Sequence, residues 1–173
     1  MKKAIHTILE TARFLLVVLV IVVPIRAYVA QPFVVNGNSM SPTFENGQYL
    51  IIDELSYHFR EPARGEVVVF RYPMNTKTFF IKRVIGLPGE TVIIKDNQVF
   101  IKDGDKNVKL EEDYIKNQVL ANTEKTLGSD EYFVMGDNRD QSYDSRFWGA
   151  VPEKLLKGKV FVRLFPIDKI TMF

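Results

Sequence analysis

The apolar residues of this chain follow two patterns, one at the amino terminus and one in the rest of the sequence. Residues 14–25 read FLLVVLVIVVPI, an uninterrupted apolar run of 12 residues, and extension back to Ala4 gives 22 residues. A helix of that length measures ~33 Å at ~1.5 Å per residue, which is enough to cross a bilayer if Glu10 and Arg13 pair or lie near the headgroups. The pattern therefore predicts one transmembrane helix.

Two other interpretations of this run are a cleaved secretory signal and a helix in a protein core. Cleavage after Ala30 would place Tyr28 at the third residue before the cut, where secretory signals require a small side chain. Residues 14–25 show no amphipathic pattern, which disfavours a core helix packed by one face. We therefore expect an uncleaved membrane anchor.

The charges around the run predict its orientation. Residues 1–13 carry three basic side chains and one acidic side chain, a net charge of +2, whereas the rest of the chain sums to zero. Because cytoplasmic flanks hold the excess of Lys and Arg, we expect a cytoplasmic amino terminus. Residues 1–30 then form the cytoplasmic terminus and anchor of a single-pass protein of the cell membrane, and residues 31–173 form an extracytoplasmic domain.

Beyond Gln31 the apolar residues change to short runs separated by Gly, Pro, Asn and Asp, which is typical of strands. We predict a mainly antiparallel β domain. Its expected strands are residues 49–53, 66–71, 78–85, 90–95, 98–102, 132–135 and 159–165. Asp96 and Asn97 tolerate the positive φ angles of a two-residue hairpin turn. Residues 103–131 are polar with few apolar anchors and are expected to be the loosest part of the domain.

Composition narrows the possible chemistry. A chain of 173 residues is sufficient for one domain, and its net charge of +2 provides no concentrated positive field, so we expect no nucleic-acid partner. The absence of Cys excludes disulfides, thiolate nucleophiles and Cys-based metal sites. His6 and His58 are the only histidines, so a multi-histidine metal centre is impossible and hydrolysis would need another base.

Two short segments contain a candidate nucleophile and a candidate base. Ser39 lies in the sequence GNSMSPT, where a turn residue bonding its own backbone is the ordinary interpretation. Strand alternation places Lys82 on one face between Phe80 and Val84. The lysine either extends its ammonium to water or is desolvated, and a desolvated amine with a pKa near ~7–8 can act as a general base.

A third segment, residues 136–146, reads GDNRDQSYDSR. It does not fit a calcium-binding loop, because one frame places Arg139 at a ligand position and the other places Ser145 where Gly is required. A solvated loop remains one interpretation. The other is a tight turn that brings Ser142 against an amine while Asp144 and Arg146 neutralise one another.

These segments, in this order, closely resemble the bacterial type I signal peptidases, membrane-bound Ser/Lys proteases that remove signal peptides from exported proteins. The resemblance extends from the anchor to Phe165 and rests on SMSPT, KRVIGLPG and GDNRDQSYDSR. One anchor and a short chain are similar to the compact Gram-positive form. The resemblance implies an antiparallel β-sheet catalytic domain of the signal-peptidase type, with no metal or cofactor.

The resemblance also implies roles for individual residues. Ser39 matches the nucleophile and Lys82 the general base, while Ser142 matches the hydroxyl that orients the lysine amine. Asp144 and Arg146 match a supporting ion pair. Asp137 and Arg139 match motif positions that we interpret as structural. The positions that match the lining of the substrate cleft are Phe33, Val35, Met40, Phe80 and Ile81.

One position departs from part of the family. Some members carry a second Ser two residues before the nucleophile, where its hydroxyl helps to bind the oxyanion, and this chain has Gly37 there. Loss of one oxyanion donor costs ~2.7–4 kcal/mol in other serine proteases, so we expect a further donor that the sequence does not locate.

The implied partners are the signal peptides of exported preproteins, cut after small-x-small segments of the Ala-x-Ala kind, and the lipid bilayer. Phe33, Phe147 and Trp148 are candidates for contact with headgroups, although a core position is the favoured interpretation of Trp148. The sequence leaves the oligomeric state unknown.

Two alternatives remain. A self-cleaving repressor of the SOS type would need a DNA-binding part and a soluble amino terminus, in place of an apolar span. A membrane-tethered β domain that binds peptides without catalysis fits the same anchor and the same strands. Substitution of Ser39 distinguishes binding from cleavage.

Overall fold

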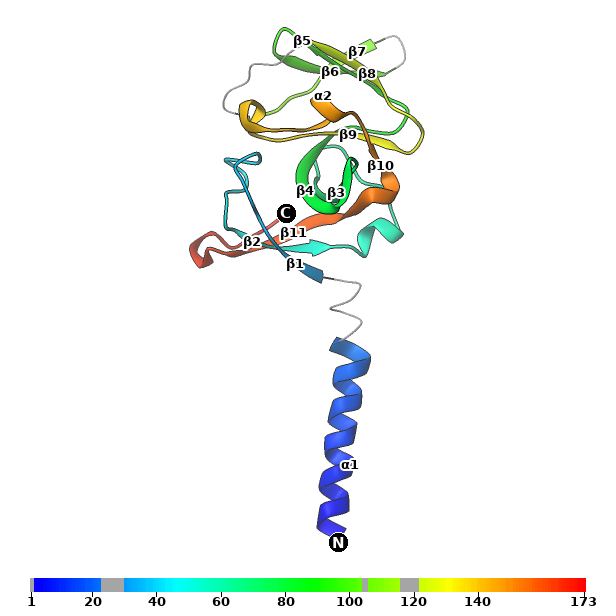
Figure 1. The fold of residues 1–173 in the computed structure, drawn as a ribbon, viewed down its shortest axis with the longest axis vertical. Helices are drawn as coiled ribbons and strands as arrows, with labels where there is room; N and C mark the ends of the chain where they lie inside the picture. The colour runs from blue at the N-terminus through cyan, green and yellow to red at the C-terminus, as the bar shows by residue number, and fades with distance from the viewer. Residues whose placement is uncertain (1, 23–29, 104–105, 116–121) are drawn as a thin grey trace.

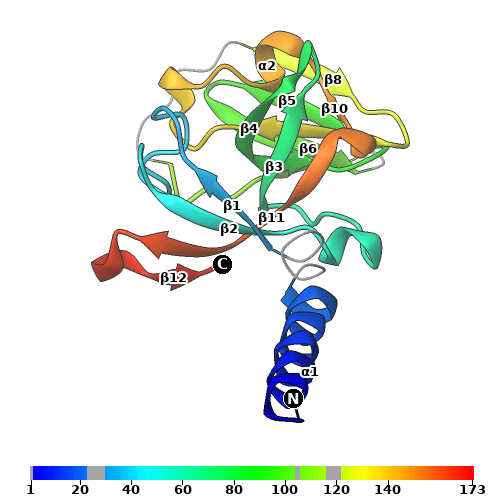
Figure 2. The same ribbon diagram turned by 60° about the horizontal axis from the view of Figure 1, so that its bottom comes forward.

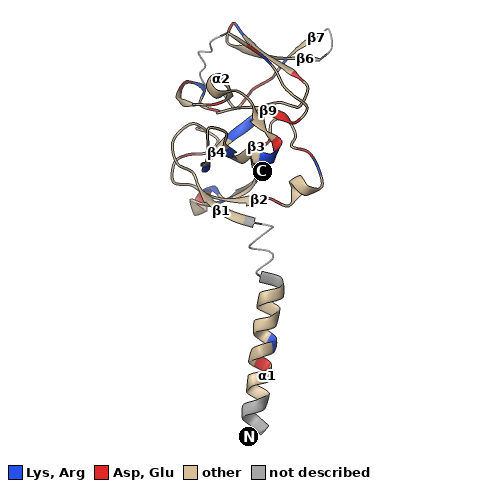
Figure 3. Ribbon diagram, turned by 45° about the vertical axis from the view of Figure 1, so that its right-hand side comes forward, with Lys and Arg blue, Asp and Glu red and all other residues tan. Residues whose placement is uncertain are grey.

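The computed structural model describes residues 2–22, 30–103, 106–115 and 122–173. The amino-terminal segment is helical, with α1 at Lys2–Val17 followed by a π-helical turn, η1, at Val18–Val22. Figure 1 shows α1 standing away from the β domain, and Figure 3 shows it built mainly from uncharged residues. The carboxyl end of the expected helix, residues 23–25, lies outside the described residues. Among the described helices, none has the length and apolarity required of a membrane span.

The β domain contains a large antiparallel sheet in the order β1-β2-β11-β3-β4-β9-β10, with β12 paired to β11. Figures 1 and 2 show β1, β2 and β11 at the end of the domain nearest α1. The strands are β1 (Ala30–Val34), β2 (Tyr49–Asp53), β3 (Val67–Tyr72), β4 (Asn75–Gly86), β9 (Glu131–Met135), β10 (Val151–Pro152), β11 (Leu156–Phe165) and β12 (Thr171–Met172).

A smaller antiparallel sheet in the order β7-β6-β5-β8 lies at the far end of the molecule from α1 (Figure 1). Its strands are β5 (Thr91–Lys95), β6 (Gln98–Asp103), β7 (Lys106–Lys109) and β8 (Thr123–Thr126). Asp96 and Asn97 join β5 to β6 with φ angles of 51° and 59°, so the expected two-residue hairpin is confirmed.

Three apolar clusters hold the sheets together. One lies between β4, β9 and the small sheet, around Ile85, Ile94 and Phe133. The second packs β2, β3 and the 35–44 segment around Phe44 and Ile52. The third cluster includes Phe70, Val84 and Trp148. Trp148 is therefore a core aromatic, as the favoured interpretation had it.

The short helical elements occupy connections between strands. The 3-10 turns are η3 (Ser56–His58), η4 (Arg139–Gln141), η5 (Glu153–Leu155) and η6 (Ile167–Lys169), and the short helix α2 spans Ser145–Trp148. The side chain of Asp144 caps α2 by accepting a hydrogen bond from the backbone N–H of Arg146. The loop from η4 to α2 is thereby fixed directly after β9.

All seven strands expected from the apolar runs are present, with their ends shifted by at most a few residues. The expectation of a loose segment over residues 103–131 is wrong for β7 and β8, which lie in this range, and residues 104–105 and 116–121 of it lie outside the described residues. Every side chain of β7 is exposed, so this strand lacks the alternation by which strands are recognised in sequence.

A close approach of backbones in the large sheet gives a test of the fold. A Cβ atom at Gly158 of β11 would lie 2.4 Å from the carbonyl oxygen of Asp53 in β2. We expect Gly158→Ala to lower the free energy of unfolding by about 1–3 kcal/mol, the usual cost of overpacking. Denaturant unfolding measures this loss. Gly128→Ala is the matched control, since its Cβ would meet only the Glu131 side chain at 3.4 Å or more, and an equal loss there would contradict the explanation.

Candidate active site

A cavity of about 540 Å³ lies where β1, β4 and the loop after η4 come together. The predicted residues Phe33, Val35, Ser39, Lys82 and Ile81 line it, as does Phe80. Residues that were not predicted from the sequence to line the cleft also line it: Val34, Asn36, Gly37, Asn38, Leu50, Val69, Thr78, Phe79, Gln141 and Tyr143. Neither histidine does, because His6 lies in α1 and His58 in η3.

The side chains of Ser39 and Lys82 meet inside this cavity. Lys82 Nζ donates hydrogen bonds to Ser39 Oγ at 2.7 Å and to the carbonyl oxygen of Ile81 at 2.9 Å. The lysine is only 4% exposed, so the alternative of an ammonium extended to water is wrong. Lys82 lies in β4, which pairs with β3 on one side and β9 on the other. The ring centre of Phe80 lies 5.3 Å from Lys82 Nζ.

Burial changes the acidity of this amine. Desolvation lowers the pKa of Lys82 to about 8, and it outweighs the negative charges of Asp144 and Asp137, which raise the pKa. The positive charge of Arg146 adds to the lowering. A substantial fraction of the lysine is therefore neutral at mildly alkaline pH, with a lone pair able to accept a proton.

The segment that carries Ser39 is held by backbone contacts. Gly37 has a φ of 92°, a conformation that glycine adopts without strain, and its N–H donates to Asn46 Oδ1 at 2.8 Å. That N–H is thus already engaged. On the other side, the N–H of Asn138 donates to the carbonyl oxygen of Ser39 at 3.0 Å.

The predicted ion pair of Asp144 and Arg146 is present and buried. Arg146 Nε donates to Asp144 Oδ1 at 2.7 Å and Nη2 donates to Oδ2 at 2.8 Å. Asp144 Oδ2 also accepts the N–H of Gly136 at 2.9 Å. A Cβ atom at Gly136 would lie 2.4 Å from the carbonyl oxygen of Ser39, so only glycine allows this loop to pack against the nucleophile segment.

Ser142 lies next to these groups and its carbonyl oxygen accepts from Arg146 Nη2 at 3.1 Å, but its hydroxyl is not hydrogen bonded to them. Its side chain is 5% exposed, and within the described residues its Oγ has no hydrogen-bond partner. Its implied role in orienting the Lys82 amine therefore stays a prediction. Met40, expected in the cleft wall, is 1% exposed and belongs to the apolar cluster with Val35 and Phe44, so it supports the cleft from beneath.

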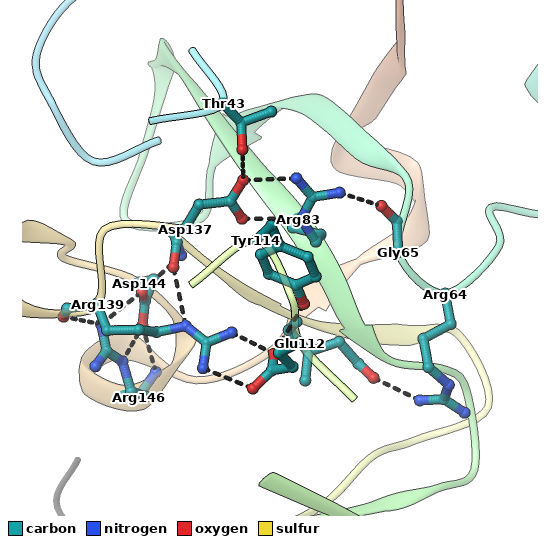
Figure 4. A network of polar contacts seen from close by, with 12 residues as sticks. Thr43, Arg64, Gly65, Arg83, Glu112, Tyr114, Asp137, Arg139, Asp144 and Arg146 are labelled. Atoms are coloured by element: carbon teal, nitrogen blue, oxygen red, sulfur yellow. Dashed lines mark hydrogen bonds and ion pairs between the residues drawn. The ribbon is translucent and has the colours of Figure 1, made fainter. Parts of the chain in front are cut away.

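Asp137 connects the same loop to β4 and to the nucleophile segment. Arg83 Nε and Nη2 donate to its two carboxylate oxygens at 2.8 and 2.5 Å, and Thr43 Oγ1 donates to Oδ2 at 2.6 Å. Figure 4 shows Asp137 between Thr43 and Arg83. Neither Thr43 nor Arg83 was predicted from the sequence as a site residue, although both lie within the motifs GNSMSPT and KRVIGLPG.

Arg139 and its partners complete the surroundings of the loop. Arg139 is buried, donates from Nε to the carbonyl oxygen of Gly136 at 3.0 Å, and forms an ion pair with Glu112. The assigned structural role of Asp137 and Arg139 agrees with these contacts. No group of three or more His, Asp or Glu side chains within the described residues is arranged to hold a metal ion.

Comparison with known proteins identifies related chains. The family model described as signal peptidase, peptidase S26, matches residues 8–165. Over 171 residues the chain is 36% identical to probable signal peptidase I-2 of Synechocystis sp., covering 95% of this chain and 77% of that protein. It is 37% identical to signal peptidase I of Leptolyngbya laminosa over 177 residues, which cover 97% of this chain and 85% of that protein.

A solved structure is also similar. The crystal structure of a signal peptidase I from Enterococcus faecalis V583 matches with a TM-score of 0.50 and 31% sequence identity. The match covers 58% of this chain and 97% of that chain. The likeness agrees with the expected antiparallel β architecture.

The buried amine predicts a pH-dependent gain in stability for Lys82→Met. The pKa of Lys82 is about 8 in the folded protein, against an ordinary value of 10.5 for a lysine in water, so burial opposes folding at pH 7 by about 3 kcal/mol, at ~1.4 kcal/mol for each tenfold change in proton affinity. That cost disappears as the pH rises from 8 to above 10.5. We expect Lys82→Met to be more stable than the unsubstituted chain at pH 7, with an advantage that shrinks by pH 10. Denaturant unfolding of both proteins at the two pH values measures this, and an unchanged difference would contradict it.

Proposed function

The chain belongs to the signal peptidase family, peptidase S26, and is therefore an endopeptidase; we propose that it removes amino-terminal signal peptides from exported proteins with a Ser39–Lys82 dyad. The observation that carries the proposal is the 2.7 Å contact between Lys82 Nζ and Ser39 Oγ in a cavity where the lysine is 4% exposed. The names of the relatives, signal peptidase I, support the substrate class.

The reaction is acyl transfer by a serine with a lysine as its base. Neutral Lys82 accepts the Ser39 Oγ proton through the same 2.7 Å contact, and Oγ attacks the carbonyl carbon of the scissile bond. The lysine then gives this proton to the departing amine. Lys82 next deprotonates a water molecule that hydrolyses the ester and restores Ser39.

Asp144 and Arg146 act on this step through their charges. A carboxylate beside the amine favours the ammonium, and it would raise the pKa of Lys82 if it were unpaired. Arg146 binds both oxygens of Asp144, which reduces that effect and supports a neutral base. Ser142 is proposed to orient the amine during the reaction.

The cavity wall supports selection of small side chains. Phe33, Val35, Phe80 and Ile81 line the cavity beside Ser39, and bulky wall residues leave only shallow pockets for the substrate. Because side chains alternate along an extended peptide, the first and third residues before the cut face the same wall. We therefore propose cleavage after small-x-small segments, with exclusion of larger residues by steric clash.

We also propose that the amino-terminal segment anchors the enzyme in the cell membrane, with the amino terminus cytoplasmic and the β domain outside. The support is the apolar run of residues 14–25, the positive charge before it, and exposed side chains such as Phe14 and Leu19, which are 68% and 63% exposed. A signal peptide lies in the same bilayer, so confinement raises the effective concentration of enzyme and substrate. Phe147, which is 66% exposed, is a candidate for contact with headgroups.

Cleavage of a model precursor tests the nucleophile. The full chain in detergent micelles should cut a precursor directly after an Ala-x-Ala segment, and mass spectrometry of the products locates the cut. Ser39→Ala should abolish cleavage while the thermal unfolding midpoint and peptide binding stay close to those of the unsubstituted chain, because only one oxygen atom is lost. Binding without cleavage by the unsubstituted chain would favour the peptide-binding alternative, and full activity of Ser39→Ala would end the assignment of this serine.

The pH dependence of activity tests the base. Only the neutral amine accepts a proton, so kcat/KM should rise as the pH increases through about 8, the pKa of Lys82. Lys82→Arg should be inactive at every pH, since a guanidinium stays protonated. His58→Ala serves as the control and should keep the profile unchanged. A profile that is flat between pH 6 and 10 would contradict the base assignment.

A further inference from the structure

We infer that Glu112 and Tyr114 are positioning residues for the dyad, and that they act by joining the loop of Asp137 and Arg139 to Arg83, the residue after Lys82. This inference rests on the proposed function, because it concerns the same active site. Neither residue belongs to the motifs that carry the family resemblance. Both lie in the polar segment 103–131, which the sequence indicated to be loose.

Glu112 is the first link. Its carboxylate forms the ion pair with Arg139, whose side chain is 0% exposed, while the Glu112 side chain is 6% exposed. Arg139 Nη1 donates to Glu112 Oε2 at 3.0 Å, and Nη2 donates to Oε1. A carboxylate bound through both oxygens by a planar guanidinium has one defined orientation. Arg139 in turn holds the carbonyl oxygen of Gly136.

Tyr114 is the second link. Its hydroxyl donates to Glu112 Oε1 at 2.8 Å, and its ring lies under Arg83, with the guanidinium carbon 4.0 Å from the ring centre. Burial, followed by the charge of Glu112, raises the pKa of Tyr114, so the phenol keeps its proton and remains a donor. Cation–π contact of this kind is strongest where the cation is partly desolvated, and Arg83 is 12% exposed.

These contacts close into a ring. Arg83 binds Asp137 through two hydrogen bonds, and Asp137 and Arg139 are two residues apart in one loop. Arg139 binds Glu112, Glu112 binds the Tyr114 hydroxyl, and the Tyr114 ring contacts Arg83. Figure 4 shows Tyr114 and Glu112 lying between the guanidinium groups of Arg83 and Arg139. A ring restrains each member more than an open chain of contacts does, because no member can move without breaking two links.

The ring touches both halves of the dyad. Arg83 and Lys82 are consecutive in β4, so fixing one backbone position fixes the other. On the serine side, Asp137 accepts from Thr43 at 2.6 Å, and the N–H of Asn138 holds the carbonyl oxygen of Ser39 at 3.0 Å. The ring therefore controls the separation of Ser39 and Lys82, and displacements of about 1 Å in such a pair cost up to ~100-fold in rate.

Kinetics of Glu112→Gln in the full chain test the inference. We expect kcat for a model precursor at 20 °C and pH 9 to fall about tenfold or more, with KM within about twofold, since the change alters the dyad and leaves the cleft wall intact. Glu111→Gln is the matched control: it makes the same change on the preceding residue, whose side chain is exposed, and it should leave kcat unchanged.

A second pair of variants separates the cation–π contact of Tyr114 from the hydrogen bond of its hydroxyl. This pair also tests the inference if Glu112→Gln does not fold. Tyr114→Phe keeps the aromatic ring under Arg83 and breaks only the link to Glu112, so kcat should fall about threefold, whereas Tyr114→Leu breaks both links and should lose about tenfold. The apparent pKa of kcat/KM should stay that of the unsubstituted chain in every variant, because neither residue donates or accepts a proton in the proposed reaction.

A stabilising role alone makes a different prediction. It would lower the thermal unfolding midpoint while leaving kcat intact at 20 °C, where the variants are folded. That result for Glu112→Gln, or equal kcat values for Tyr114→Phe and Tyr114→Leu, would overturn the inference. If the unsubstituted chain cuts no precursor, or if Ser39→Ala still cuts, the proposed function fails instead, so the two failures are distinguishable.

Discussion

The Lys82 amine lies out of water, 2.7 Å from the Ser39 hydroxyl, and keeping it there opposes folding because the charged form is desolvated. Apolar packing offsets this cost. β4 carries Lys82 between β3 and β9, and its neighbour Val84 is fully buried with Phe70 in one apolar cluster. The chemistry of the cleft therefore depends on the middle of the large sheet, where β4 pairs with a strand on each side.

The distribution of counter-charges around the amine favours its neutral form. Three acidic side chains around the loop are each bound by a guanidinium: Asp137 by Arg83, Asp144 by Arg146 and Glu112 by Arg139. Within the described residues Lys82 itself takes part in no ion pair. A free carboxylate at the amine would raise its pKa and keep the proton on nitrogen. The arginines hold the loop and also reduce the tendency of the carboxylates to keep the Lys82 amine protonated.

Much of this architecture was predictable because its causes are local. Short apolar runs between turn residues predicted the strands, Asp96 and Asn97 predicted a hairpin, and short motifs, through the family they resemble, pointed to Ser39 and Lys82. The contacts of Glu112 with Arg139 and of Tyr114 with Arg83 were not predictable, since they join segments far apart in the chain and depend on how the sheets pack. Polar composition indicated solvent exposure, yet Glu112 is buried by an arginine, and no pattern along one segment reveals such a partner.

The placement of Glu112 and Tyr114 limits how this protein can change in length during evolution. The strands β7 and β8 that flank them carry mostly exposed side chains, so homologues can lengthen or shorten the small sheet there without disturbing the cleft. Between Glu112 and Tyr114 the spacing is set by the distance from Arg139 to Arg83. An insertion of even one residue at that point would uncouple the two arginines, so this short stretch should keep its length while its surroundings drift.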